Sequence, residues 1–171
     1  MRLINCVITM SLIFLISTNG FTQDELKSRK EIREERKMQI QNRVDSMIRA
    51  ADYVFMARSA HPMSMQVVDL TSGYELRVIG DSVSVYLPYY GRAYQPDYSS
   101  TEGGIKLEVL SEEYSLKDED DGYEISFKAE SDADTYTFNL SVSRSGYASL
   151  HVSSNNRQSI TFNGIIKGIG L

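Results

Sequence analysis

Residues 123–142 read YEISFKAESDADTYTFNLSV, and this stretch decides the fold class. Apolar and polar side chains alternate along residues 123–129 and again along residues 136–142. A period of two is the pattern of a β-strand with one buried and one solvated face. Only a short acidic segment, residues 132–134, separates the two runs, so the two strands must be antiparallel neighbours.

The same alternation continues in both directions from this pair. It predicts further strands at residues 53–60, 65–70, 74–78, 83–87, 105–109, 114–116, 148–152 and 160–162. A two-residue turn at Gly80-Asp81 joins two of them, which is hairpin chemistry. A sheet of about nine strands must curl, close or be covered. We therefore expect a mainly β (α+β) fold, with an N-terminal helix packed on a strongly curved antiparallel sheet or barrel-like meander of roughly 8–10 strands.

Residues 23–51 contain no Gly or Pro and predict one helix. An apolar stripe at helical spacing marks its second half as the part that packs on the sheet: Ile40, Val44, Met47, Ile48 and Ala51. The segment 27–37 carries six basic and three acidic residues. It is interpreted as a solvated face, and docking on a partner is the alternative.

The N-terminus predicts an export signal. Arg2 precedes an apolar run, residues 3–16, and small and polar residues follow it. We expect cleavage after Thr22, with Gly20 as the second choice, and a β domain over residues 52–171 after the helix. The run is shorter than the roughly 20 residues that span a bilayer, and an uncleaved anchor is the alternative.

Cys6 is the only cysteine and lies inside the apolar run, too early to be a lipid anchor. We therefore expect a periplasmic or secreted chain with no disulfide, no lipid anchor and no transmembrane segment after cleavage. The formal net charge of −5 argues against a nucleic-acid partner, because phosphate binding needs a basic face.

No arrangement typical of catalysis or cofactor binding is found in the sequence. His61 and His151 lack the further ligands that zinc requires, so we predict no metal. The turn at residues 118–122 does not follow the spacing of a calcium loop and is interpreted as a soluble hairpin tip. We predict no catalytic residue and no cofactor, although two carboxylates distant in sequence could still meet in space and make a hydrolase.

Residues 86–104 form a long tyrosine-rich insertion between two strands. Tyrosine and arginine are enriched where proteins bind partners. The predicted contact residues are Tyr89, Tyr90, Arg92, Tyr94 and Tyr98. The alternative is that these rings fold back and plug one end of the sheet. Asn156 and Arg157 are a second candidate, for which simple turn chemistry is the favoured interpretation.

Six segments of the β-rich part carry a family resemblance: residues 53–57 (YVFMA), 70–74 (LTSGY), 87–94 (LPYYGRAY), 103–105 (GGI), 122–127 (GYEISF) and 154–160 (SNNRQSI). In these segments the chain resembles an uncharacterised domain family of Bacteroidota envelope proteins, the domain of unknown function number four-two-five-one. The resemblance implies export and one small domain, and it implies no activity. Many relatives resemble lipoproteins, and this chain departs from them because it lacks a usable anchor cysteine.

We therefore expect an exported, non-enzymatic binding or interaction module of the bacterial envelope that contacts a protein, peptide or glycan through residues 86–98. The alternative is a structural or assembly factor that docks through its charged helix, and a hydrolase is less favoured.

Overall fold

The computed structural model describes residues 28–71, 73–92, 104–131 and 134–169. The chain divides into two compact units, residues 1–35 and 36–171. The second unit holds the sheet, whose strands are β1 (Asp52–Pro62), β2 (Val68–Asp69), β3 (Glu75–Ile79), β4 (Ser82–Leu87), β5 (Ile105–Leu110), β6 (Glu112–Glu119), β7 (Gly122–Glu130), β8 (Thr135–Ser143), β9 (Tyr147–Ser154) and β10 (Ile160–Lys167).

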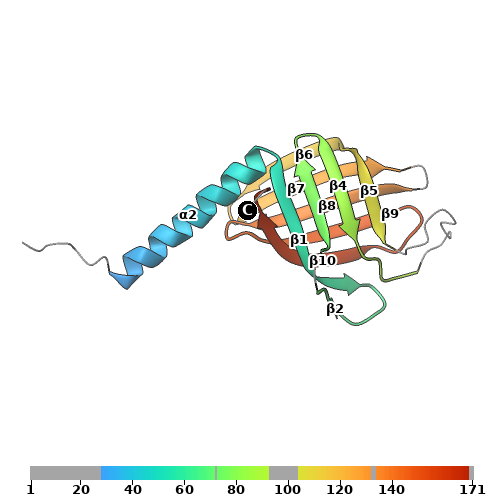
Figure 1. Cartoon of the computed structure of the whole chain (residues 1–171), viewed down its shortest axis with the longest axis horizontal. Helices are drawn as coiled ribbons and strands as arrows, with labels where there is room; N and C mark the ends of the chain where they lie inside the picture. The colour runs from blue at the N-terminus through green and yellow to red at the C-terminus, as the bar shows by residue number, and fades with distance from the viewer. Residues whose placement is uncertain (1–27, 72, 93–103, 132–133, 170–171) are drawn as a thin grey trace, which may run out of the picture. The chain divides into compact units, whose positions relative to one another are not determined.

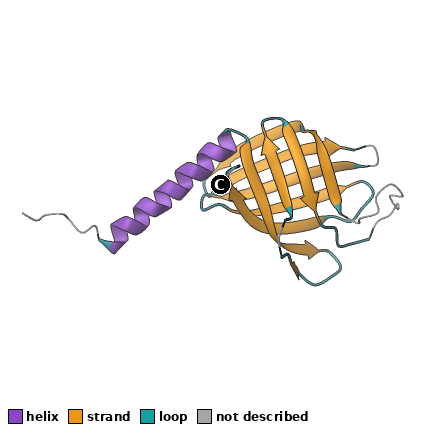
Figure 2. Cartoon of the chain, viewed as in Figure 1, coloured by secondary structure: helices purple, strands orange, loops and turns teal. Residues whose placement is uncertain are grey.

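The strands form one antiparallel sheet that curls into a nearly closed barrel (Figures 1 and 2). Its order is β5-β4-β3-β1-β10-β9-β8-β7-β6, with β2 paired to β1 only. The first long strand therefore pairs with the last, and the opening lies between β5 and β6, which are joined through Ser111 alone. The expectation of a helix on a curved, mainly β, barrel-like meander is confirmed.

The interior is filled by the side chains that the alternation assigned to one face. In β7 and β8, Phe127 lies opposite Phe138, and their rings stack with centroids 5.0 Å apart. The polar residues that alternate with them, such as Thr137, are only half-buried. Burial of the inward apolar side chains supplies the main driving force of the fold.

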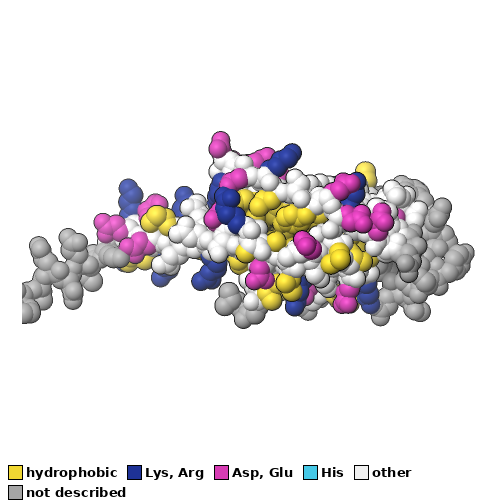
Figure 3. Space-filling view, turned by 90° about the horizontal axis from the view of Figure 1, so that it is seen from above, with side chains coloured by type: hydrophobic (Ala, Val, Ile, Leu, Met, Phe, Trp, Pro, Cys, Tyr) yellow, Lys and Arg dark blue, Asp and Glu magenta, His cyan; other side chains and the backbone are white. Residues whose placement is uncertain are grey.

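On the outer surface over the sheet, further apolar side chains gather, with charged side chains around them (Figure 3).

Two strands approach unusually closely where β1 pairs with β10. A Cβ on Gly164 would lie 2.0 Å from the Met56 carbonyl oxygen, so only glycine fits there. Immediately afterwards the register shifts between Ala57 and Ser59. Arg58 is the extra residue of this β-bulge and is exposed, and after it the buried positions change from Phe55 and Ala57 to Ala60 and Pro62.

Helix α2 (Arg29–Arg49) begins directly after its N-cap Ser28, which forms a capping box with Glu31. The Ser28 amide donates to the Glu31 carboxylate at 2.9 Å, and the Lys30 amide donates to the Ser28 hydroxyl at 3.4 Å. Residues 23–27 of the predicted helix 23–51 lie outside the described residues. After the helix, Ala51 adopts a left-handed conformation (φ 48°), which ends the helical hydrogen bonding.

The last turns of α2 pack on the sheet through Val44 and Ile48, which are 3% and 0% exposed. Val44 lies over the β8–β9 turn, where Gly146 has a φ of +87° and a Cβ would meet the Val44 Cγ2 atom at 3.4 Å. The predicted apolar stripe is only partly covered, because Met47 is half-buried and Ile40 remains 49% exposed.

The strand predictions need two corrections. The run 65–70 forms only the short β2, because only Val68 and Asp69 pair with β1, and Met65 and Val67 before them are more than half exposed. The last strand extends to Lys167, beyond the predicted residue 162, because its main chain continues to pair with β1 as far as Val54.

Candidate functional site

The start of the tyrosine-rich insertion closes one end of the barrel. The Tyr89 ring packs against the core, and its hydroxyl lies 3.0 Å from the Arg92 carbonyl and 3.1 Å from the Gln158 carbonyl. The Gln158 amide in turn donates to the Arg92 carbonyl at 3.1 Å. Tyr90 is also half-buried against the core. The described part of the insertion is therefore held down on the sheet.

The two predicted candidate segments meet at this place. The Arg157 guanidinium lies 5.1 Å from the centre of the Tyr89 ring and donates to the Gly104 carbonyl at 3.4 Å. Asn156 belongs to the same turn and is half-buried. Tyr94 and Tyr98 lie outside the described residues. The geometry joins Tyr89, Arg92 and Arg157 in one cluster, and whether this cluster contacts a partner stays a prediction.

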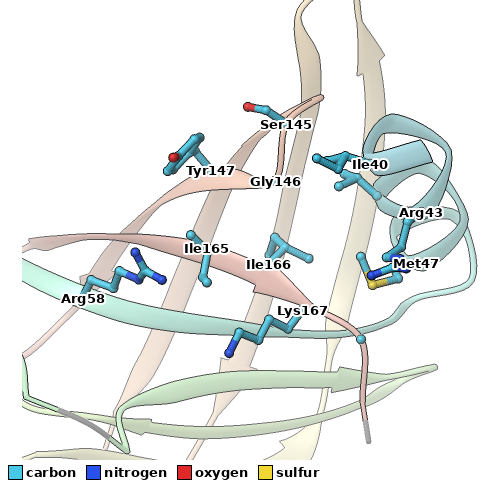
Figure 4. A pocket seen from close by; sticks show the side chains of 12 residues that line it. Ile40, Arg43, Met47, Arg58, Ser145, Gly146, Tyr147, Ile165, Ile166 and Lys167 are labelled. Carbon is cyan, nitrogen blue, oxygen red and sulfur yellow. The ribbon is translucent and has the colours of Figure 1, made fainter. Parts of the chain in front are cut away.

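A groove that the sequence did not indicate lies between the second half of α2 and the strands β1, β9 and β10 (Figure 4). It has a volume of about 650 Å³, within the range of roughly 300–1,000 Å³ that is usual for small-molecule sites. Its lining residues are Ile40, Arg43, Val44, Met47, Arg58, Ser145, Gly146, Tyr147, Ile165, Ile166, Lys167 and Gly168.

The charged side chains of this groove are all cationic. Arg43 comes from the helix, Arg58 from the β1 bulge and Lys167 from the end of β10. All three are exposed, and none makes an ion pair with the residues that the structure describes. The groove thus combines an apolar surface with unpaired positive charge in a chain whose net charge is −5.

A ring of polar contacts clamps the helical wall of the groove to the sheet. The Tyr123 hydroxyl donates to Asp45 at 2.6 Å, and Arg144 donates to the Tyr123 hydroxyl at 2.7 Å and to Asp118 at 2.6 Å. Arg49 completes the ring, with Asp45 at 2.7 Å and with Asp118. The clamp ties α2 to the β6–β7 hairpin and the β8–β9 turn.

The same contacts shift the acidity of their members. The Tyr123 hydroxyl, and after it the Arg49 guanidinium, holds the pKa of the Asp45 carboxyl below its usual value. Burial, and then the Asp45 carboxylate, raises the pKa of the Tyr123 hydroxyl. At neutral pH Asp45 is therefore a carboxylate and Tyr123 a neutral donor. Asp118, predicted to lie at a soluble hairpin tip, is used to hold the helix.

The two histidines take part in ordinary hydrogen bonds. His61 Nε2 lies 3.1 Å from the Ser59 hydroxyl and 3.0 Å from the Asn163 amide nitrogen, and His151 Nδ1 lies 3.0 Å from the Thr161 hydroxyl. In the part of the chain that the structure describes, no group of three or more His, Cys, Asp or Glu side chains is placed to hold a metal ion. No helix among the described residues has the length and hydropathy to cross a bilayer.

A second hollow of about 380 Å³ lies on the outer surface of β6–β9. It is lined by polar side chains, among them Glu112, Glu113 and Glu130, and Lys128 pairs with Glu113 at 2.7 Å. It offers no apolar floor and its cation is already paired, so it is a weaker candidate than the groove beside α2.

Fold and site together define a small barrel-like β domain with a clamped helix and an external, cationic, apolar groove. The chain matches the model of the domain of unknown function DUF4251 over residues 35–166 and belongs to that family. It is similar to the crystal structure of a DUF4251 family protein from Bacteroides eggerthii, with a TM-score of 0.59 and 15% identity over 76% of this chain and 88% of the other. This likeness shows the fold. No curated protein matches the chain.

Proposed function

We propose that the protein is an exported, non-enzymatic binding module of the bacterial envelope, and that its contact surface is the groove beside α2. The observation that carries this proposal is the combination of exposed apolar side chains and unpaired cations in one concave site. Ile40 and Tyr147 are 49% and 68% exposed at its edge. Concave sites with an apolar lining and a few polar groups are the usual form of ligand pockets.

The clamp supports a binding role because it fixes the groove before any ligand arrives. Asp45, Tyr123 and Arg144 hold α2 from the side opposite to the apolar wall. A preorganised wall lowers the entropy that binding must overcome.

Within the tyrosine-rich segment 86–98, the part that the structure describes, residues 86–92, is proposed as a second contact surface. Tyr89 and Arg157 form a cation–π pair whose members are half-buried rather than protruding. This arrangement favours a plug at that end of the barrel, and it is the reason for placing the main contact surface at the groove. Docking through the charged segment 27–37 is the alternative, and Ile32 within it is 38% exposed.

Native mass spectrometry of the protein purified from its producing cells tests the proposal. We expect extra mass over the bare chain, lost in a variant that carries Ile40→Glu and Tyr147→Glu. Both side chains are exposed, so the change removes little core. Ile79→Glu is the matched control, because Ile79 is 50% exposed and lies outside the groove. Equal extra mass in all three proteins would refute the groove as the contact surface.

A further inference from the structure

We propose that the groove beside α2 binds a free single-chain amphiphile with an anionic head, such as an alkyl carboxylate or alkyl phosphate. This inference rests on the proposed function and names the ligand class of the same site. Three observations carry it: the chemistry of the groove floor, the sign and placement of its charges, and its size.

The floor suits an alkyl chain. Ile40, Val44 and Met47 contribute one helical face, spaced three and four residues apart, and Ile165 and Ile166 contribute the end of β10. Figure 4 shows the helical residues on one side and the β10 residues with Tyr147 on the other. An alkyl chain laid between these walls would remove exposed apolar surface on both sides from water, which is the main source of affinity for such ligands.

The charges select an anionic head. The lining contains Arg43, Arg58 and Lys167 and no Asp or Glu, although acidic residues outnumber basic ones in the chain. Arg58 and Lys167 lie on the paired strands β1 and β10, and Arg43 faces the groove from α2. An arginine fork can bind a carboxylate or a phosphate with two hydrogen bonds. Arg58 and Arg43 each bring such a fork to the groove.

The size favours a small ligand over a protein segment. A ten-residue helix, about 15 Å long and about 10 Å across, fills roughly 1,200 Å³, nearly twice the groove volume of about 650 Å³. A methylene group takes about as much space as a water molecule, roughly 30 Å³, so a chain of twelve to sixteen carbons fills about 350–500 Å³. The acidic chain would be repelled by an anionic membrane surface, which favours an amphiphile taken up free from solution.

The absence of tryptophan from the sequence permits a clean fluorescence test. Tyr147→Trp places one reporter in the groove. Leu110→Trp is the matched control, because Leu110 is 70% exposed at the end of β5 and lies outside the groove. Each protein is titrated with monomeric dodecanoate, dodecyl phosphate and dodecyltrimethylammonium. We expect saturable emission changes at Tyr147→Trp with both anions, at least tenfold weaker binding of the cation, and no saturable change at Leu110→Trp.

Charge variants in the Tyr147→Trp background locate the head. Because exposed ion pairs each contribute up to about 1 kcal/mol, Arg58→Gln and Lys167→Gln should each weaken dodecanoate binding about two- to fivefold. Lys117→Gln, an exposed change outside the groove, should leave binding unchanged. Equal binding of the cationic and anionic amphiphiles would overturn the proposal. Saturation only by an acidic amphipathic peptide, or only by anionic vesicles, would also overturn it and identify the occupant as a protein or a membrane.

The two proposals fail in different ways. If no dodecyl amphiphile binds but native extra mass is still lost in the variant with Ile40→Glu and Tyr147→Glu, the ligand class is wrong and the groove stands as a contact surface. If the amphiphiles do not bind and the native mass is the same in that variant and in Ile79→Glu, both proposals are refuted.

Discussion

Two buried tyrosines predict opposite results for the same chemical change. Tyr53 and Tyr123 are 0% and 2% exposed, and both lie inside the barrel-like domain. The Tyr123 hydroxyl joins Asp45 and Arg144 in the clamp. The Tyr53 hydroxyl lies near that of Tyr114, but neither makes a hydrogen bond of normal geometry with the described residues. Tyr123→Phe therefore removes a hydroxyl that makes two hydrogen bonds, and Tyr53→Phe removes a hydroxyl that makes none.

The magnitude follows from the contacts that are lost. A hydrogen bond contributes a net of about 0.5–1.5 kcal/mol, and Tyr123→Phe removes two. The side chains of Asp45 and Arg144 are 40% and 31% exposed, so water replaces part of the loss. We expect Tyr123→Phe to lower the free energy of unfolding by about 1–2 kcal/mol, which corresponds to about 2–8 °C in Tm for a domain of this size. Tyr53→Phe removes a buried, unpaired oxygen and should leave stability unchanged or raise it by up to about 1 kcal/mol.

Urea unfolding followed by circular dichroism measures both variants against the wild type, with equal m-values required for the comparison. The expected order of midpoints is Tyr53→Phe at or above wild type, and Tyr123→Phe clearly below it. A loss in Tyr53→Phe equal to that in Tyr123→Phe would refute the reasoning, because it would mean that hydroxyl pairing does not decide the cost.

Three further predictions concern the clamp, the β1–β10 contact and the helix start. The pKa of the Asp45 carboxyl is lowered in the folded state, so the stability that this group contributes is present above its usual pKa of 3.8 and is lost as pH falls through the folded pKa. The difference in Tm between wild type and Asp45→Asn should therefore shrink below about pH 4. A difference in Tm that stays constant with pH would contradict this. Gly164→Ala would place a Cβ atom 2.0 Å from the Met56 carbonyl oxygen, and it should lower the free energy of unfolding, measured in urea, by about 3 kcal/mol or more. A loss below about 1 kcal/mol would be inconsistent with the close approach of β1 and β10. Ser28→Ala removes the capping box and should raise amide exchange in the first turn of α2 by an amount equivalent to about 1 kcal/mol, with exchange in β8 unaffected as the internal reference.

Much of the fold could be predicted because the alternation is a local signal. Phe138 and Leu140 are fully buried, and Asn139 between them is exposed, as the period of two requires. The pairing of β1 with β10 could not be predicted in this way, because it joins residues that are 98 to 113 positions apart, from Pro62 with Ile160 to Val54 with Lys167. The strand predicted at residues 65–70 is longer than the observed β2 for the same reason, since alternation does not show which residues find a hydrogen-bonding partner strand.

The groove could not be predicted because its members come from distant parts of the chain and each has an ordinary local appearance. Ile40 belongs to an apolar stripe that predicts burial, yet it is 49% exposed, while Val44 one turn later packs over the β8–β9 turn. Arg58 looks like an ordinary outward residue of a strand, and only the fold brings it to the same groove as Ile40. The clamp was missed in the same way, because Asp45, Tyr123 and Arg144 are far apart in sequence.

Methyl-selective NMR of isoleucine-labelled protein tests the central claim, that the groove is a binding site, most directly. During titration with monomeric dodecanoate, we predict saturable shifts of the Ile40, Ile165 and Ile166 methyl signals with one common dissociation constant. The signals of Ile79 on the surface and of Ile125 in the core should remain in place. Shifts that never saturate, or that are as large at Ile79 as at Ile40, would contradict a binding site between α2 and β10.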